Sequence, residues 1–181
     1  MKISACDWSM TTPAITIFED GKYEFHYCTS NKKHAHTFTK YNIFGAMLLV
    51  DWKTQEQRFD ALSSWAMDII GLSDIVYIED YAFAARGKVF NIGECAGLLK
   101  HRIWKSGMHL KAISPTEIKK YATGKGTAKK PQMIEKFIEI TGIDLYGIYG
   151  LCETSKNLSP IADIADSFFV CKCGMENYNV G

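Results

Sequence analysis

Four acidic residues stand in mainly apolar surroundings, two of them at the ends of apolar segments and two within one. Asp7 follows the run "ISAC" and Glu79 follows "IVYI", while Asp163 and Asp166 are three residues apart in "IADIADSFF". Residues three apart in a helix face the same side, one turn from each other. If the segments that end at Asp7 and Glu79 are neighbouring strands of one sheet, we expect the four carboxylates to converge.

Converging carboxylates repel each other and raise one another's pKa unless a cation neutralises them. Oxygen-rich clusters suit Mg²⁺, and Mn²⁺ is able to substitute for it. Two such ions about 4 Å apart can activate a water and stabilise the leaving oxygen in phosphodiester cleavage. The four acids therefore predict a divalent-metal site with hydrolytic chemistry.

Each acid also has a structural interpretation. Asp163 would lie in the first turn of its helix, where the helix dipole favours an acid, and Asp166 could simply be solvated. Asp7 and Glu79 fit this interpretation less well, because a charge at the end of an apolar strand is rarely buried without a partner.

Basic residues surround the glycine-containing segment "TGKGTAKK". They are Lys119, Lys120, Lys125, Lys129 and Lys130. A solvated lysine-rich loop is one interpretation. Beside the four acids we favour contacts with the phosphate backbone of a nucleic acid, with Lys129 or Lys130 stabilising charge on the scissile phosphate. The spacing of a nucleotide-binding P-loop is absent.

The segment that follows Glu79, "DYAFAARGKVF", combines aromatic and basic residues. Tyr81 and Phe83 could stack on unpaired bases, and Arg86 and Lys88 could contact nearby phosphates. The structural alternative for the two aromatic residues is packing against the next helix.

The apolar pattern predicts five strands, at residues 1–7, 13–20, 22–30, 75–78 and 108–114. An Asp20-Gly21 hairpin signal separates the second and third strands, and we predict that the first three form an antiparallel meander, while the later strands alternate with helices. Helices are predicted after Thr54, between Val89 and Gly107, from Ser114-Pro115, from Pro131 and from Ser159-Pro160, with Ser114 and Ser159 as the caps of their helices. We therefore predict one α/β domain over residues 1–181, a mixed five-stranded sheet flanked by helices, of which the RNase H-like fold is one example.

The composition is that of an ordinary globular protein. Hydrophobic residues make up 47% of the 181 residues, and 21 basic against 20 acidic residues leave a net charge of +1, so any nucleic-acid site must be a local patch.

Six scattered cysteines predict reduced thiols in a cytoplasm, and their spacing with His34 and His36 fits no familiar zinc site. No run approaches the roughly 20 apolar residues of a membrane span, and no signal peptide precedes the first strand.

Several of these motifs together resemble RuvC-type Holliday-junction resolvases. The resemblance rests on "ISACDWS", "YIEDYAF", the long segment from "GECAGLL" to "KKPQM", and "IADIADSFF", in that order along nearly the whole chain. It implies an RNase H-like fold, a homodimer, and metal-dependent cleavage of symmetrically related strands in a four-way DNA junction. It also implies metal-ligand roles for Asp7, Glu79, Asp163 and Asp166, and a junction-inserting aromatic at Tyr81 or Phe83.

The resemblance is incomplete in three places. "WSMTTP" replaces the family's glycine-rich turn after the first aspartate, and residues 31–41 and 144–157 match nothing in the family. Such divergence would suit a phage-encoded member that acts in the cytoplasm of its bacterial host. Two alternatives stay open: a broader RNase H-like nuclease that cuts flaps, forks or RNA–DNA hybrids, and a junction-binding module that does not cleave. The apolar helix over residues 89–107 is a candidate dimer contact, with burial inside the monomer as the other possibility.

Overall fold

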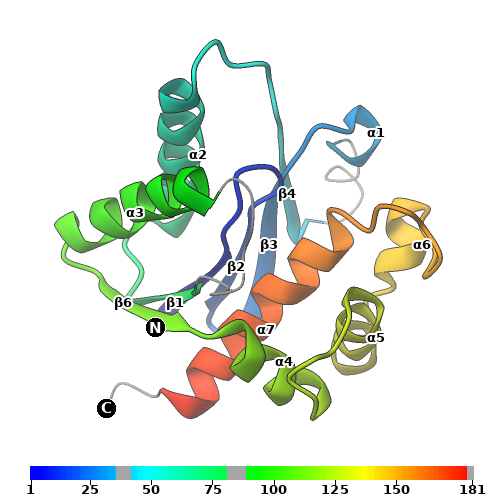
Figure 1. Cartoon of the computed structure of the whole chain (residues 1–181). Coiled ribbons are helices and arrows are strands. Elements are labelled where there is room, and N and C mark those ends of the chain that lie inside the picture. Colours follow the sequence, from blue (N-terminus) through cyan, green and yellow to red (C-terminus); the bar gives the residue numbers. More distant parts are fainter. Residues whose placement is uncertain (36–41, 81–88, 179–181) are drawn as a thin grey trace.

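The computed structural model describes residues 1–35, 42–80 and 89–178. Figure 1 shows a central sheet with helices on both of its faces. The strands of this sheet are β1 (Lys2–Asp7), β2 (Ala14–Glu19), β3 (Lys22–Thr29), β4 (Phe44–Leu48), β5 (Ile75–Glu79) and β6 (His109–Ile113).

The strands of the described residues are arranged in the order β4-β3-β2-β1-β5-β6. β1, β2 and β3 form the predicted antiparallel meander, while β5 and β6 run parallel to β1. The mixed α/β sheet is therefore confirmed, but its predicted strand number was wrong. The sixth strand, β4, pairs in parallel with the outer side of β3.

β4 was not predicted, because its sequence "FGAML" contains a glycine and does not alternate between apolar and polar residues. Gly45 lies beside His26 of β3, and a Cβ at Gly45 would overlap the His26 imidazole. The glycine that weakens the strand signal is thus what allows the two backbones to pair.

Helices in the described residues are α1 (Lys32–Ala35), α2 (Gln55–Ile70), α3 (Val89–Lys105), α4 (Pro115–Thr123), α5 (Lys130–Thr141), α6 (Leu145–Tyr149) and α7 (Ile161–Asn177). The predicted Ser114 cap is confirmed, because its hydroxyl accepts a hydrogen bond from the Glu117 N–H at 3.2 Å. α7 begins at Ile161 without a side-chain cap, so the predicted capping role of Ser159 was wrong. All of these helices are too short or too polar to traverse a lipid bilayer within the described part of the chain.

Alternating residues of the strands separate two apolar layers. Ile3 and Ala5 of β1 and Tyr77 of β5 pack in the larger core with α7, α4 and α5. The intervening Cys6 and Ile78 face the opposite layer, beneath α2 and α3. α7 lies across the sheet and is itself covered by α4 and α5, as Figure 1 shows.

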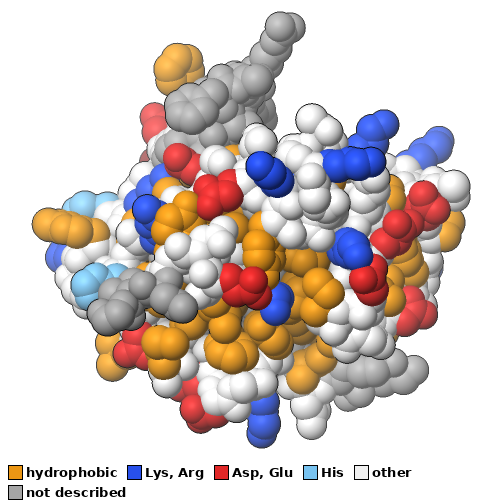
Figure 2. All heavy atoms as spheres, turned by 90° about the horizontal axis from the view of Figure 1, so that it is seen from below, with side chains coloured by type: hydrophobic (Ala, Val, Ile, Leu, Met, Phe, Trp, Pro, Cys, Tyr) orange, Lys and Arg blue, Asp and Glu red, His pale blue; other side chains and the backbone are white. Residues whose placement is uncertain are grey.

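Figure 2 views the end of the molecule opposite the carboxyl ends of the parallel strands, where apolar side chains gather. The lower part of the molecule in Figure 1 contains α4 and the last turns of α7. Partly buried apolar residues that pack against the larger core include Phe18, Tyr23, Tyr121 and Met175. None of the four acids singled out above belongs to this end.

Candidate active site

Asp7 and Glu79 occupy the last positions of two adjacent parallel strands. Cys6 of β1 is in register with Ile78 of β5, so the next residues, Asp7 and Glu79, stand side by side at the carboxyl edge of the sheet. Strand alternation puts both on the face that Ala5 and Tyr77 present to α7. The expected convergence of these two acids therefore follows from strand order and register.

α7 carries the second pair of acids across this face. Asp163 lies in its first turn and is 6% exposed, and Asp166 is one turn further along. The Ser167 hydroxyl forms a buried 2.8 Å hydrogen bond with that of Thr16 on β2, which fixes the helix over the sheet next to Asp166. β1, β5 and α7 thus position all four acids.

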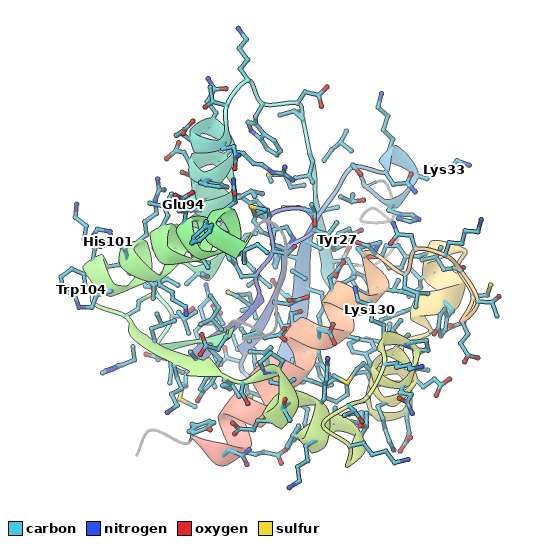
Figure 3. The ribbon with its side chains drawn as sticks, in the orientation of Figure 1. Tyr27, Lys33, Glu94, His101, Trp104 and Lys130 are labelled. Carbon is cyan, nitrogen blue, oxygen red and sulfur yellow. The ribbon has the colours of Figure 1, made fainter. Side chains whose placement is uncertain are left out.

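The four acids line one pocket of about 600 Å³. The remaining lining residues are Ser9, Thr11, Thr12, Lys119, Ala128, Lys129, Lys130 and Met133. Lys119 comes from α4, and the other two lysines come from the start of α5. Figure 3 shows Lys130 in the region between α5 and α7. The pocket therefore combines four carboxylates with three ammonium groups.

Burial and mutual repulsion raise the pKa values of the acids. The pKa of Asp7 is raised well above its usual value by burial, by the charges of Glu79, Asp166 and Asp163, and by a hydrogen bond with Glu79. Burial and the Glu79 charge raise the pKa of Asp166 to about 7. Burial also raises the pKa of Glu79 and that of Asp163, although nearby lysines act in the opposite direction. The cluster resists full ionisation unless a cation is supplied.

Asp163 is engaged by polar neighbours on both of its oxygens. The Ser159 hydroxyl donates to Asp163 Oδ2 at 2.5 Å, and Lys130 Nζ lies 3.7 Å from Asp163 Oδ1. Ser159 thus contacts the carboxylate of the first helical turn.

The donor set fits Mg²⁺ or Mn²⁺, because four carboxylates at a solvent-accessible pocket provide hard, anionic oxygen ligands. Among the described residues, however, no group of three or more His, Cys, Asp or Glu side chains is already arranged to hold a metal ion. The carboxylates share one pocket without converging on one point.

The predicted basic residues divide into two groups. Lys119, Lys129 and Lys130 line the pocket. Lys120 on α4 and Lys125 in the loop are exposed and do not line it. The backbone N–H of Lys129 donates to Gln132 Oε1 at 2.9 Å, which fixes the start of α5 beside the acids. The carboxyl-terminal end of the segment "TGKGTAKK", which lines the pocket, is therefore held in place by the start of α5.

The predicted contacts at Tyr81, Phe83, Arg86 and Lys88 lie outside the described residues and stay predictions, as does any role of His36. The other residues considered for zinc do not form a cluster. Cys171 and Cys173 are buried in the core, while Cys152 is exposed beyond α6.

Sequence reasoning missed the polar residues that complete the pocket. Ser9, Thr11 and Thr12 belong to "WSMTTP", and the Ser9 hydroxyl accepts a hydrogen bond from the Thr12 N–H at 3.0 Å. A hydrogen bond from Thr12 lowers the pKa of Asp163, opposing the effect of burial. Their position directly after Asp7 was the available signal, since a hairpin loop that follows a site residue remains at the site.

No protein-family model matches the sequence, and no curated protein matches it either. Solved structures do match. The Thermus thermophilus RuvC structure has a TM-score of 0.59 and 14% identity, with 96% of this chain and 95% of that chain covered. The yeast mitochondrial Holliday junction resolvase Ydc2 has a TM-score of 0.58 and 13% identity, with 96% of this chain and 77% of that chain covered.

A viral protein is similar over an equally large part of the chain. The fowlpox virus resolvase, solved with a Holliday junction DNA substrate, has a TM-score of 0.52 and 18% identity, with 98% of each chain covered. These likenesses confirm the predicted fold class from bacterial, fungal and viral examples. The chain has the same fold as these solved Holliday junction resolvases.

Proposed function

We propose that this protein is a divalent-metal-dependent endodeoxyribonuclease that resolves four-way DNA junctions by paired symmetric nicks. One observation carries the proposal: Asp7, Glu79, Asp163 and Asp166 line a single pocket together with three lysines. A protein that only binds DNA gains nothing from repelling carboxylates that face a polyanion. The likeness to solved resolvases supports the choice of substrate.

In this proposal the four carboxylates would hold two Mg²⁺ ions, whose four positive charges would balance four ionised acids. When bound, the metal supplies the charge that polarises the scissile phosphate and activates water. Lys129 and Lys130 would orient the phosphate at the pocket mouth, and Lys119 would add charge from the α4 side. The exposed Lys120 and Lys125 would contact phosphates further along the same DNA arm. The proposal includes a location in the cytoplasm of a bacterium or of a phage-infected cell.

Paired nicks require two copies of the pocket related by a twofold axis, and α3 offers a surface for a second copy. Phe90 is 85% exposed and Trp104 is 71% exposed. Glu94, Gly97 and His101 are exposed between them. The spacings along these five residues are four, three, four and three, which describes one stripe on a helix. Figure 3 shows Glu94, His101 and Trp104 along the length of α3.

The stripe is complementary to itself when two α3 helices run antiparallel. With Gly97 on the twofold axis, Phe90 of one copy meets Trp104 of the other, and Glu94 meets the turn that carries His101. A Cβ added at Gly97 would have no atom within 4 Å, so this point of the monomer surface is open to a close helix approach. We therefore place the homodimer contact on this stripe of α3, whose opposite side packs Leu99 and Ile103 into the core.

The decisive experiment incubates the purified protein with a labelled synthetic four-way junction, with Mg²⁺ or with EDTA, beside linear duplex, flap and RNA–DNA hybrid controls. We expect paired symmetric nicks in the junction alone, lost with EDTA and restored by Mg²⁺ or Mn²⁺. Cleavage of flaps or hybrids instead would assign the acids to a broader nuclease. Tight junction binding without cleavage would identify a binding module.

A further inference from the structure

The acid pocket already contains a cation of the protein's own. Lys130 Nζ lies 3.7 Å from Asp163 Oδ1, and 59% of the Lys130 side chain is exposed. The charge of Lys130 also lowers the pKa of Glu79 and of Asp166, so the ammonium group acts on three of the four acids. A divalent cation bound by these acids would occupy the same part of the pocket.

Both oxygens of Asp163 already have a polar partner, so a metal ion bound there would have to share Asp163 with these partners or replace one of them. Its Oδ2 accepts the Ser159 hydroxyl at 2.5 Å, and its Oδ1 faces the Lys130 ammonium. A lysine on a four-carbon stem can swing away, because its backbone is fixed by α5 while its side chain is largely exposed. Ser159 is held by the backbone just before α7 and has a much shorter reach. Lys130 is therefore the contact that can be exchanged.

We propose that Lys130 is an internal counter-cation, which a divalent metal must displace from Asp163, and that a DNA phosphate binds the displaced ammonium group. The inference rests on the proposed function and concerns how its site is regulated. Each ligand then removes an obstacle to the other, since the metal releases Lys130 for the phosphate and the phosphate draws Lys130 away from the acids. Metal and DNA should bind with positive cooperativity, and the effect must be equal in both directions.

Lys129 provides a matched control from the same pocket. It precedes Lys130 in the chain, lines the same pocket and is also exposed. Among the ion pairs of the described residues, Lys130 pairs with Asp163, and Lys129 is not found in any. Loss of Lys129 should therefore weaken DNA binding without making metal binding easier.

The test is calorimetric titration of the wild type, Lys130→Met and Lys129→Met with Mg²⁺, in the absence of DNA. We expect Lys130→Met to bind Mg²⁺ about fivefold more tightly than the wild type, because a competing positive charge has been removed, and Lys129→Met to stay within about twofold. A repeat with Ca²⁺ and a bound four-way junction should show tighter metal binding to the wild type than in the absence of DNA. This gain should shrink in Lys130→Met.

Unfolding experiments in EDTA at pH 7.5 give a second readout. Lys130→Met should unfold at a lower denaturant concentration than the wild type, because the ionised acids lose their internal counter-charge, and Mg²⁺ should reverse this loss. If the wild type binds Mg²⁺ and cleaves junctions, but Lys130→Met binds Mg²⁺ no more tightly than the wild type, Lys130 is not a counter-cation. The proposed function would stand in that case. A wild type that binds no divalent metal would overturn both.

Discussion

Asp7 and Glu79 stand beside each other at the ends of β1 and β5, and a hydrogen bond between their carboxyls raises the pKa of Asp7. This pairing is unfavourable in the metal-free protein at neutral pH, because two buried carboxylates cannot both ionise without cost. Neither residue caps a helix or closes a turn, so local structure does not account for the pair. The proposed role of both residues as metal ligands would account for the pair.

Replacement of Asp7 by asparagine should abolish cleavage of four-way junctions and preserve junction binding. The amide keeps the size of the side chain but removes a metal-binding charge, and it also relieves repulsion, so the free energy of unfolding should stay equal or rise. Gel-based cleavage and binding assays, together with denaturant unfolding, check this. Asp68→Asn, on the exposed side of α2, is the matched control and should cleave normally. Loss of folding in Asp7→Asn would make Asp7 a structural residue.

Without metal, the protein should lose stability as the pH rises from about 4 to about 7. The pKa of Asp166 is raised to about 7 from 3.8, so the folded state holds a proton that the unfolded state releases. A folded state that binds more protons is favoured at low pH and loses this advantage as the pH passes through the raised pKa. We expect a change of roughly 1–3 kcal/mol in the free energy of unfolding, measured with denaturant in EDTA.

Two comparisons isolate this contribution from other titrating groups. Asp166→Asn should flatten the pH dependence, and Mg²⁺ should stabilise the wild type more at pH 7.5 than at pH 5. Burial lowers the pKa of His26, which by itself would reduce stability as the pH falls below about 6.5. A pH dependence that is identical in the wild type and in Asp166→Asn would contradict the raised pKa of Asp166.

Joint replacement of Lys129 and Lys130 by glutamine should weaken junction binding for every DNA sequence. The two ammonium groups are expected to neutralise phosphates, so the slope of log affinity against log salt should become shallower by about 2. Fluorescence anisotropy over a salt series in EDTA measures this slope. Lys22→Gln, at the opposite end of the sheet, should leave the slope unchanged. An unaltered slope in the double variant would indicate that residues other than Lys129 and Lys130 contact the phosphates.

Replacement of Trp104 by glutamate should convert a dimer into a monomer. The side chain is 71% exposed, so the monomer loses little, while a charge that faces Phe90 of the other copy in the proposed contact is costly. Sedimentation velocity at micromolar concentration gives the mass. Ile140→Glu on α5, where the side chain is 49% exposed, is the control and should remain dimeric.

Gly97→Leu provides a second test of the same surface. It should also separate the copies, because the larger side chain would hold the two helices apart. A monomeric wild type would contradict the proposed dimer contact on α3. So would a dimer that persists in both Trp104→Glu and Gly97→Leu.

Replacement of Gly174 by alanine should destabilise the protein by about 1–3 kcal/mol, because overpacking forces the backbone or the ring to move. A Cβ there would lie 2.5 Å from the Tyr77 ring of β5, which is 2% exposed. Since α7 carries two of the four acids, the shift should also weaken Mg²⁺ binding. Thermal unfolding with and without Mg²⁺ checks both effects. Gly93→Ala on α3, where the added Cβ has no atom within 4 Å, should stay within about 1 kcal/mol of the wild type.

The sequence by itself predicted the α/β class, the antiparallel meander and most of the helices. Each of these depends on local signals: strand alternation, the Asp20-Gly21 turn, and the Ser114-Pro115 helix start. It also singled out the four acids, because two of them end apolar strands and the other two lie one turn apart in an apolar helix. These features depend on neighbours in the chain, which one sequence shows directly.

Only the tertiary structure decided what those residues meet. β4 was missed because an edge strand gains its hydrogen bonds from a partner that lies almost twenty residues away, and its glycine weakens the local signal. The sequence did not show that Ser159 and Lys130 both engage Asp163, or that Lys120 and Lys125 lie outside the pocket that Lys119 helps to line. Such contacts depend on how α4, α5 and α7 pack against one another, and packing between distant segments leaves no periodic pattern in the chain.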